Sequence, residues 1–573
     1  MLSALAPQIV SKSLQPNRHD EKIAKGQRVL PSPFRVVVDA GSTGSRLHIF
    51  ELVPSSADKD TKSNSDIQRI ECLRRGSSKA WTPLSAFAPP SLDDEGASKR
   101  QINARKEPLN ATHVAHHMLP LFDYASIVIP HEFHSSTPVR IAATAGMRLL
   151  SLEDQSHVYD ALYAGLLEQV DNGRFVFTNL KRDDIITLSG EREGFYGAIA
   201  ANYLRGVVDA ELRVIVPKVM DSAVDSGDDG SRRRKKTDPN DTNDEGICTN
   251  KFGMCEEDAE NVIFGPSHHY VPQNMHDVKR FGPLGALDMG GSSTQIVYRN
   301  EKYKSHEANE GKESDSGISY SGMIEDDVLP SHLNDKDFFS NSYLSYGVDQ
   351  FRERLWDLWV TEADETIIYN PCSFVGYEMS YKGHNLIGTG NALRCAEQIF
   401  RLIPFHDNVT NLDELNEENI ESSTSTKDQR EPTTKRNMVG GIEHPPLRGK
   451  FYGISLYFFT LDCLRELSDP DHPIHVSWPT PSIEELTHAL DAFCARQWQG
   501  DLEDVQHEAH EHTRAEVLPH RCLEAVYMVT LLRDGFGFHP TSRDVTFVQW
   551  VEGNEVEWSL GMTLSEFAEG KGR

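Results

Sequence analysis

Two segments of the chain share one pattern of apolar and polar positions. In residues 34–50 an apolar β-branched run ends at Asp39, GSTGSR follows, and alternating apolar residues resume. In residues 285–298 a shorter apolar run ends at Asp288, GGSST follows, and QIVY continues. Apolar runs on either side of a short Gly-rich turn are typical of a β-hairpin. The chain therefore predicts two hairpins, each with an aspartate at the end of its first strand.

The two predicted turns carry groups that suit phosphate. Glycines such as Gly41 and Gly44 let backbone N–H groups approach oxyanions, and the neighbouring hydroxyls donate hydrogen bonds. Each aspartate can hold a hydrated divalent cation. A single turn of this kind is best explained as an ordinary hairpin. Two of them, each led by an aspartate, favour two related lobes that present phosphate loops to one cleft.

The remaining apolar periodicity alternates between strand-like and helix-like segments. A helix is expected at residues 113–124 and a strand at 139–143, and residues 545–562 indicate strands followed by a terminal helix. Apolar periodicity also recurs at residues 343–359, 451–467 and 483–498. Alternating strands and helices predict α/β architecture.

Chain length and polar tracts suggest a division into lobes. A chain of 573 residues is too long for one simple core, so two lobes are expected. Polar composition predicts a disordered tail at residues 1–31 and surface insertions at about 217–260, 300–335 and 411–446. The expected first lobe is 32–188 plus 536–573, with the first phosphate loop, and the second is 189–535, with the second loop.

The charge balance disfavours one class of partner. Lys and Arg total 58 and Asp and Glu total 87, so the net charge is −29 at pH 7. Nucleic-acid binding is not expected, because there is no basic excess to displace counterions from phosphates. A small phosphorylated substrate is compatible with an acidic protein, since a divalent metal and backbone amides can offset the repulsion locally.

The cysteines and glycosylation sequons bear on the cellular compartment. The eight cysteines include no paired CxxC pattern, so a structural zinc site is not expected. Sequons occur at Asn110, Asn240 and Asn408. Both features favour an oxidising lumen and a glycoprotein. Against this, the N-terminal residues show no convincing signal-peptide core, and no apolar run reaches the length needed to span a bilayer.

Two further stretches between the hairpins carry candidate chemistry. Residues 141–150, IAATAGMRLL, predict a strand ending in Thr144 before a helix whose N-terminus suits phosphate, and a plain capped junction is the alternative. Residues 189–204, SGEREGFYGAIAANYL, predict a helix with Glu191 and Glu193 in its first turn. The glutamates fit either a general preference for acids at helix starts or a general base.

These four stretches, in this order, resemble the apyrase family of nucleoside triphosphate and diphosphate diphosphohydrolases, which includes guanosine diphosphatases. A fifth matching stretch is FYGISLYFFTLDC at residues 451–463, and smaller matches occur at 79–85, 370–372, 388–395 and 558–561. The resemblance runs from about residue 34 to 565, the polar insertions excepted. It implies an α/β fold of two actin-like (ribonuclease H-like) lobes with an active-site cleft between them.

The resemblance also implies roles for individual residues. Asp39 and Asp288 would hold a Ca²⁺ or Mg²⁺ ion, largely through water. Glu193 matches the catalytic base, and Ser293 and Gln295 would position the attacking water. Phe459 falls where an aromatic residue stacks on the nucleobase, with packing in the core as the alternative. The implied phosphate-binding and nucleotide-binding positions are Ser42, Thr43, Gly44, Ser45, Arg46, Thr144, Gly290, Gly291, Ser292 and Phe459.

The resemblance extends to the cysteines. Cys372 and Cys395 match a disulfide position of the family, and Cys494 with Cys522 are expected to form another. A pairing of Cys248 with Cys255 stays open. Cys72 and Cys463 are expected to be buried free thiols.

The predicted function is divalent-metal-dependent hydrolysis of the terminal phosphate of nucleoside diphosphates, triphosphates or both, by a water activated by Glu193. The resemblance places it in the lumen of the secretory pathway (Golgi or ER) or outside the cell. One alternative is an inactive nucleotide-binding regulatory protein, which the presence of Asp39, Glu193 and Asp288 disfavours. Another is an exopolyphosphatase or sugar kinase of the same superfamily, which the GSTGSR and SGEREG stretches disfavour. The oligomeric state stays open.

Overall fold

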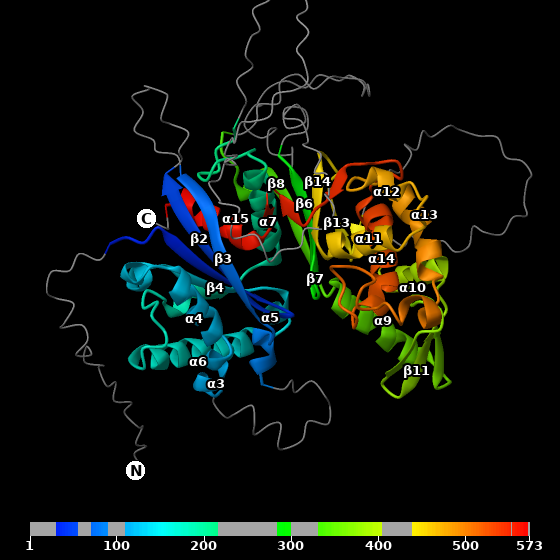
Figure 1. Cartoon of the computed structure of the whole chain (residues 1–573), viewed down its shortest axis with the longest axis horizontal. Coiled ribbons are helices and arrows are strands. Elements are labelled where there is room, and N and C mark those ends of the chain that lie inside the picture. Colours follow the sequence, from blue (N-terminus) through cyan, green and yellow to red (C-terminus); the bar gives the residue numbers. More distant parts are fainter. Residues whose placement is uncertain are drawn as a thin grey trace, which may run out of the picture. The chain divides into compact units, whose positions relative to one another are not determined.

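The first phosphate-loop hairpin lies at the centre of a five-stranded sheet in the order β3-β2-β1-β4-β5 (Figure 1). Its strands are β1 (Phe34–Gly41), β2 (Gly44–Pro54), β3 (Ile70–Ala80), β4 (Val139–Ala143) and β5 (Ile185–Thr187). β1 and β2 are antiparallel with Asp39 opposite Arg46, and β4 runs parallel to β1. The hairpin and the strand at 139–143 predicted from the sequence are confirmed.

The second hairpin occupies the same place in a second five-stranded sheet, in the order β15-β14-β6-β7-β8. Its strands are β6 (Gly285–Met289), β7 (Ser293–Arg299), β8 (Phe338–Leu344), β14 (Phe451–Ser455) and β15 (Val545–Phe547). β6 and β7 are antiparallel with Asp288 opposite Gln295, and β14 is parallel to β6. Each sheet therefore consists of a three-stranded antiparallel meander extended by two parallel strands, as expected of two related lobes.

The computed structural model describes residues 30–54, 70–89, 109–215, 283–299, 331–403, 438–551 and 553–570, all within one compact unit. The sequons at Asn240 and Asn408 and the pairing of Cys248 with Cys255 lie outside the described residues, as do most of the tail and insertions predicted from the sequence. The predicted lobe boundaries stay a prediction.

The other elements surround the two sheets. The helices are α3 (Ala111–His116), α4 (Leu119–Val128), α5 (Ala145–Arg148), α6 (Leu152–Asp171), α7 (Gly190–Leu204), α9 (Val348–Glu362), α10 (Ala392–Leu402), α11 (Leu456–Glu466), α12 (Ile474–Ser477), α13 (Ile483–Cys494), α14 (Arg521–Thr530) and α15 (Trp558–Ala568). The shorter strands are β9 (Ile367–Asn370), β10 (Glu378–Tyr381), β11 (His384–Gly388), β12 (Met438–Val439), β13 (Ile442–Glu443), β16 (Trp550–Val551) and β17 (Asn554–Glu555). None of these helices is both long and apolar enough to cross a membrane.

The single helix predicted at residues 113–124 is wrong, because the chain forms two helices there. Asn110 caps the first, α3, by accepting a hydrogen bond from the backbone N–H of His113. Pro120 lies at the start of the second, α4. Proline has no N–H to donate to the preceding turn, so it begins a helix and does not continue one.

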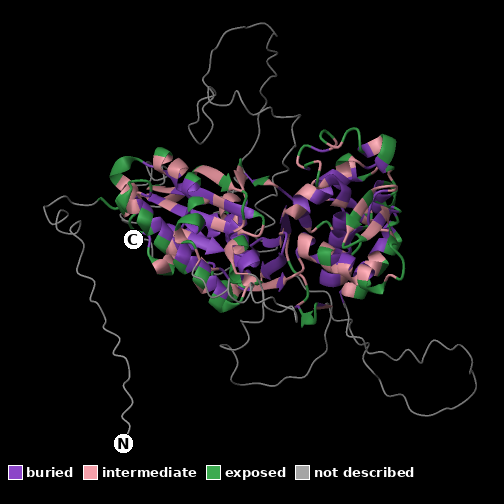
Figure 2. Cartoon of the chain, turned by 90° about the horizontal axis from the view of Figure 1, so that it is seen from below, coloured by how far each residue is buried: buried purple, intermediate pink, exposed green. Residues whose placement is uncertain are grey.

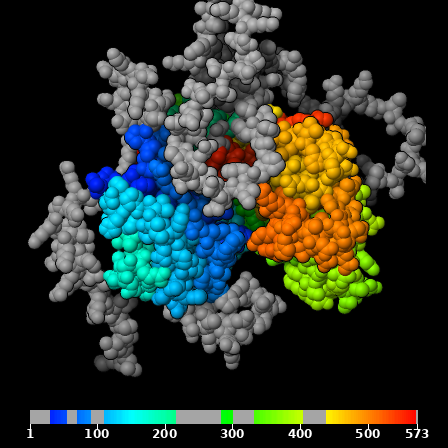
Figure 3. Space-filling model, in the orientation of Figure 1, coloured from blue at the N-terminus to red at the C-terminus, as the bar shows by residue number. Residues whose placement is uncertain are grey.

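Each sheet packs against its own group of helices and has its own hydrophobic core. The first core joins β1, β2 and β4 to α3, α4 and α6, and the second joins β6, β7 and β14 to the helices from α9 to α14. Buried residues fill both bodies (Figure 2), and the space-filling view separates the blue-to-cyan residues of the first from the yellow-to-orange residues of the second (Figure 3).

The disulfides expected from the resemblance are both formed, and both belong to the second core. Cys372, just after β9, bonds Cys395 in the first turn of α10, and Cys494 at the end of α13 bonds Cys522 in α14. Cys72 and Cys463 are buried free thiols, as expected. The pairing prediction is therefore confirmed within the described residues.

Two helices, α7 and α15, cross at a point of very close approach (Figure 1). A Cβ atom at Gly561 of α15 would lie 1.9 Å from the carbonyl oxygen of Tyr196 in α7. Only glycine therefore fits at this crossing. α7 also contacts β6, β7 and β8 of the second sheet, while α15 contacts β1 and β2 of the first. The crossing is one of the places where the two lobes are joined.

Replacing Gly561 with alanine should lower the thermal unfolding midpoint, because the added methyl group forces the two helices apart. Overpacking of this kind costs about 1–3 kcal/mol. Gly197→Ala in α7 is the matched control, since a Cβ there meets only Ile454 at an ordinary 3.9 Å. The control should be neutral or slightly stabilising. Equal midpoints for the two variants would contradict the close crossing.

Candidate active site

The two phosphate loops predicted from the sequence approach each other in the structure. A Cβ atom at Gly291 of the second loop would lie 3.2 Å from Ser42 Oγ of the first. A Cβ atom at Gly146, at the start of α5, would lie 3.0 Å from Ser42 Cα. The first loop, the second loop and the start of α5 therefore meet around Ser42. The second loop and α5 each approach it with a glycine.

Three carboxylates, Asp39, Glu193 and Asp288, lie close enough for their charges to interact. Burial is the main cause that raises the pKa of Asp39 to about 8, and the charge of Glu193 is the next. Burial likewise raises the pKa of Glu193 to about 7, with Asp288 adding to the shift and Arg148 opposing it. Burial also raises the pKa of Asp288, against hydrogen bonds from Ser455 and the Met289 backbone. The three candidate acids thus form one electrostatic cluster.

Arg148 connects Glu193 to the second loop. Its guanidinium donates to Glu193 Oε2 at 2.8 Å, to Ser293 Oγ at 3.0 Å and to the carbonyl oxygen of Leu188 at 2.9 Å. Gln295 Nε2 donates to Ser293 Oγ at 2.7 Å and to Glu193 Oε2 at 3.2 Å. The three predicted catalytic residues are therefore brought together around one arginine.

Sequence reasoning missed Arg148, although it lies in the stretch IAATAGMRLL that was already assigned to phosphate binding. The available signal was a basic residue at the end of a very short helix, α5. A cation in that place ordinarily stabilises the helix C-terminus. Its actual partners lie 45 and 145 residues further along the chain, which no local pattern reveals.

Small residues allow α7 to bring Glu193 against β7. A Cβ atom at Gly194 would lie 2.7 Å from Val297 Cγ2 and 3.1 Å from Gln295 Cβ. Ser189 caps the helix by accepting a hydrogen bond from the backbone N–H of Arg192. This cap fixes the first turn, which carries Glu191 and Glu193. Glu193 is buried and Glu191 is exposed. Of the two acids, the structure therefore directs Glu193 into the cluster.

The start of α9 holds the second loop in place. The backbone N–H of Val348 donates to the carbonyl oxygen of Gly290 at 3.0 Å, and that of Asp349 donates to Gly291 at 2.9 Å. A Cβ atom at Gly347 would lie 2.3 Å from the backbone nitrogen of Ser292. The second loop therefore packs directly on the start of α9, which binds its backbone carbonyl groups.

The other candidate residues of the first lobe differ in exposure. Ser45 is buried, and its hydroxyl has no hydrogen-bond partner among the described residues. Thr144 is buried and lies directly before α5. Its hydroxyl makes no capping hydrogen bond to that helix. Ser42 is half-buried and Thr43 is exposed at the turn. Of these residues, Ser42 is the one that lies where the two loops meet.

Arg46 and Phe459 have protein partners of their own. Arg46 lies 3.1 Å from Glu557 and 3.4 Å from Glu555, while its charge still lowers the pKa of Asp39. Phe459 lies half-buried on α11, with its ring centroid 5.7 Å from those of Phe458 and His512. Both proposed contacts with a nucleotide stay predictions.

The acid cluster fits a divalent cation. Asp39 Oδ1 is buried and has no hydrogen-bond partner among the described residues, in a site where the carboxylates of Glu193, Glu557 and Asp288 repel it. Such an oxygen is costly unless a cation or a proton approaches it. Carboxylates together with water are the ligands that Ca²⁺ and Mg²⁺ prefer. Asp39 and Asp288 are therefore suited to the role expected of them.

Residues 106–231 and 259–570 match the GDA1/CD39 (nucleoside phosphatase) family. The chain belongs to this family. Similar proteins include the bovine (Bos taurus) ectonucleoside triphosphate diphosphohydrolase 1, 24% identical over 556 residues that cover 93% of this chain and 80% of that protein. The Golgi apyrase of Saccharomyces cerevisiae is 24% identical over 573 residues, covering 93% and 70%. Membership of the GDA1/CD39 family confirms the predicted family and the prediction of a nucleoside phosphohydrolase.

A solved structure supports the fold of this GDA1/CD39 family member. The crystal structure of nucleoside triphosphate hydrolases from Neospora caninum superposes with a TM-score of 0.53 at 15% identity, covering 97% of this chain and 96% of that one. At this identity the likeness shows the fold alone. It confirms the predicted α/β fold of two actin-like lobes.

Replacing Arg148 with methionine should lower the thermal unfolding midpoint, because it leaves the buried Glu193 without its cationic partner. Loss of one member of a buried ion pair costs about 3 kcal/mol. Adding Glu193→Gln should recover part of the loss, since no buried charge then remains unpaired. A cycle of the wild type, both single variants and the double variant measures this by calorimetry. Strictly additive losses would contradict the pairing.

Proposed function

We propose that the chain hydrolyses the terminal phosphate of nucleoside diphosphates and triphosphates, using a divalent cation and a water activated by Glu193. The observation that carries this proposal is the convergence of Asp39, Glu193 and Asp288, from three elements, beside the two phosphate loops. The names of its relatives, an ectonucleoside triphosphate diphosphohydrolase and a Golgi apyrase, support the substrate class.

The phosphates would lie between the two hairpins. Backbone amides and hydroxyls of the first loop, around Ser42, and of the second, around Gly291, would donate to phosphate oxygens. Asp39 and Asp288 would hold Ca²⁺ or Mg²⁺, largely through water. When bound, that ion neutralises charge on the phosphate oxygens. We assign the positioning of the water and the proton transfer to side chains of the protein.

Glu193 would act as the general base through Oε1. The hydrogen bonds from Arg148 and Gln295 both fall on Oε2. Oε1 is therefore the oxygen that we assign to accept the proton. The water would be held by Ser293 and Gln295. Its proton passes to Glu193, its oxygen bonds to the terminal phosphorus, and the bond from that phosphorus to the bridging oxygen breaks. The products are inorganic phosphate and the shortened nucleotide, with no phospho-enzyme.

Arg148 is a positioning residue in this proposal. It fixes one oxygen of Glu193 and the hydroxyl of Ser293 at the same time. Its charge also opposes the rise that burial causes in the pKa of Glu193. A carboxyl whose pKa is about 7 accepts a proton readily near neutral pH, as a general base requires.

We further propose that the protein works in the lumen of the secretory pathway or outside the cell. Disulfides persist in oxidising compartments, and the described residues form two of them. Relatives named Golgi apyrase and ectonucleoside triphosphate diphosphohydrolase 1 agree with such a location. We also propose that Asn110, which lies in a glycosylation sequon, is glycosylated in that compartment.

Replacing Glu193 with glutamine should reduce kcat by about 10²–10⁴-fold and leave nucleotide affinity nearly unchanged, because the amide cannot take the proton. Phosphate release and equilibrium binding of a nucleoside diphosphate measure the two effects. The matched control is Glu191→Gln, since Glu191 lies in the same helical turn and is exposed. Near-normal turnover in the Glu193 variant, or an equal loss in the control, would remove Glu193 from this role.

Chelation with EDTA should abolish turnover, and Ca²⁺ or Mg²⁺ should restore it. In wild-type protein either ion should also raise the thermal unfolding midpoint, because it relieves repulsion among the acids. Asp39→Asn should lose this shift. Glu191→Gln, which alters an exposed carboxylate in the same helical turn as Glu193, should keep it. An unchanged shift in the Asp39 variant would show that the cation binds elsewhere.

A further inference from the structure

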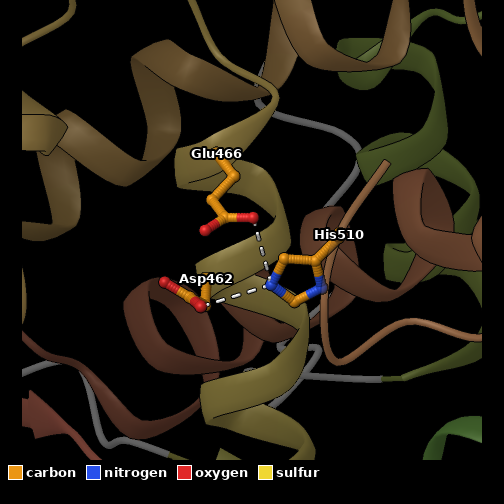
Figure 4. A group of neighbouring side chains, drawn as sticks. All are labelled: Asp462, Glu466 and His510. Atoms are coloured by element: carbon orange, nitrogen blue, oxygen red, sulfur yellow. Dashed lines mark hydrogen bonds and ion pairs between the residues drawn. The ribbon is translucent and has the colours of Figure 1, made fainter. Parts of the chain in front are cut away.

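A second group of metal-ligand side chains lies on α11 and the segment after α13, apart from the acid cluster. Asp462 and Glu466 project from adjacent turns of α11, and His510 faces both of them (Figure 4). His510 Nε2 lies 3.2 Å from Asp462 Oδ2 and 3.8 Å from Glu466 Oε2. The three ligand atoms all lie within 4.8 Å of one another. Asp462 and His510 are buried, whereas Glu466 keeps contact with solvent.

Arg465 orients both carboxylates toward the histidine. Its guanidinium lies 2.7 Å from Asp462 Oδ1 and 3.1 Å from Glu466 Oε1. The arginine thus takes one oxygen of each acid, and the other oxygen of each faces His510 Nε2. Two carboxylate oxygens and one imidazole nitrogen therefore converge on a common point.

The other ring nitrogen of His510 forms a hydrogen bond with Thr513. His510 Nδ1 lies 2.8 Å from the hydroxyl oxygen of Thr513, which itself accepts from Arg521 Nε at 3.0 Å. We assign the proton to Nδ1, which then donates to this oxygen. In that tautomer Nε2 presents a lone pair to two oxygens that are acceptors only. A metal ion between them would bind all three ligand atoms at once, whereas a proton on Nε2 would serve one of the two oxygens.

We propose that Asp462, Glu466 and His510 bind a divalent transition metal ion, with Zn²⁺ as the best fit. One imidazole nitrogen and two carboxylate oxygens are a usual zinc ligand set, completed by water. Bonds of about 2.0–2.1 Å at tetrahedral angles place ligand atoms about 3.3 Å apart. The two distances from His510 Nε2, 3.2 and 3.8 Å, lie near this spacing. The two carboxylate oxygens, within 4.8 Å of each other, reach it by movement of Glu466, whose exposure allows the movement and also admits the fourth ligand. The missing CxxC pairs disfavour a cysteine-ligated zinc site and do not bear on a site of histidine and carboxylates.

The proposed site anchors a segment that has little regular structure of its own. Between residues 503 and 517 the chain forms turns only. Two residues beyond the site, the ring of His512 lies 5.7 Å from that of Phe459. Further on, Arg514 lies 5.5 Å from the ring centroid of Trp81, which belongs to the segment that follows β3. A metal at His510 would therefore fix a segment that contacts both lobes, as structural metals do elsewhere.

Zinc binding to the full-length protein tests this proposal independently of hydrolysis. The protein is freed of metal with a chelator, placed in excess Mg²⁺ to occupy the acid cluster, and titrated with Zn²⁺ against a chromophoric competitor. One equivalent should bind, and Co²⁺ in its place should give the absorption bands of a nitrogen- and oxygen-ligated tetrahedral ion. Glu466→Gln should weaken zinc binding by at least about ten-fold, because it removes a charged ligand.

The same histidine-rich stretch, HEAHEH at residues 507–512, supplies matched controls. His507→Gln and Glu511→Gln alter exposed residues outside the cluster, and both should bind zinc as the wild type does. His510→Gln should abolish binding, with its circular dichroism spectrum and unfolding midpoint as the folding control. The proposal is overturned if the wild type binds no zinc, if Glu466→Gln binds it normally, or if His507→Gln loses it. Absence of zinc binding together with a protonated His510 by NMR would identify the cation as a proton.

Discussion

The confinement of three acids within one small region is the constraint on which the rest of the structure depends. Asp39, Glu193 and Asp288 come from β1, α7 and β6, and burial together with repulsion from nearby carboxylates raises the pKa of Asp39 to about 8. A folded chain tolerates such an arrangement only where its surroundings fix the geometry. Here the fixing group is Arg148, which binds Glu193 and the second loop at once. The remaining repulsion is what a bound cation would relieve.

Close backbone packing provides the rigidity that this arrangement needs. Gly194 lets α7 lie against β7, Gly347 lets α9 lie against the second loop, and Gly561 lets α15 cross α7. Side chains at these positions would push apart the elements that carry the acids. The same strand order in both sheets then places one hairpin, with its aspartate and its phosphate loop, in each lobe. The fold thereby converts two similar local patterns into two sides of one site.

Much of this arrangement could be predicted because the decisive signals are local. Alternation around a Gly-rich turn predicted both hairpins, and acids following Ser189 predicted the start of α7. The break between α3 and α4 was also readable, since Pro120 marks it, yet it was missed. Arg148 and the cluster around His510 could not be found in this way. Their partners are distant in sequence, and only the packing of lobes and helices brings them together.

The most direct test of the central claim is a crystal structure with Mn²⁺ and a non-hydrolysable nucleoside diphosphate analogue. Anomalous scattering locates the ion without reference to activity. We expect a peak between the carboxylates of Asp39 and Asp288, with the terminal phosphate beside it and a water within hydrogen-bond reach of Glu193. A peak away from these acids, or phosphates bound outside the two hairpins, would contradict it.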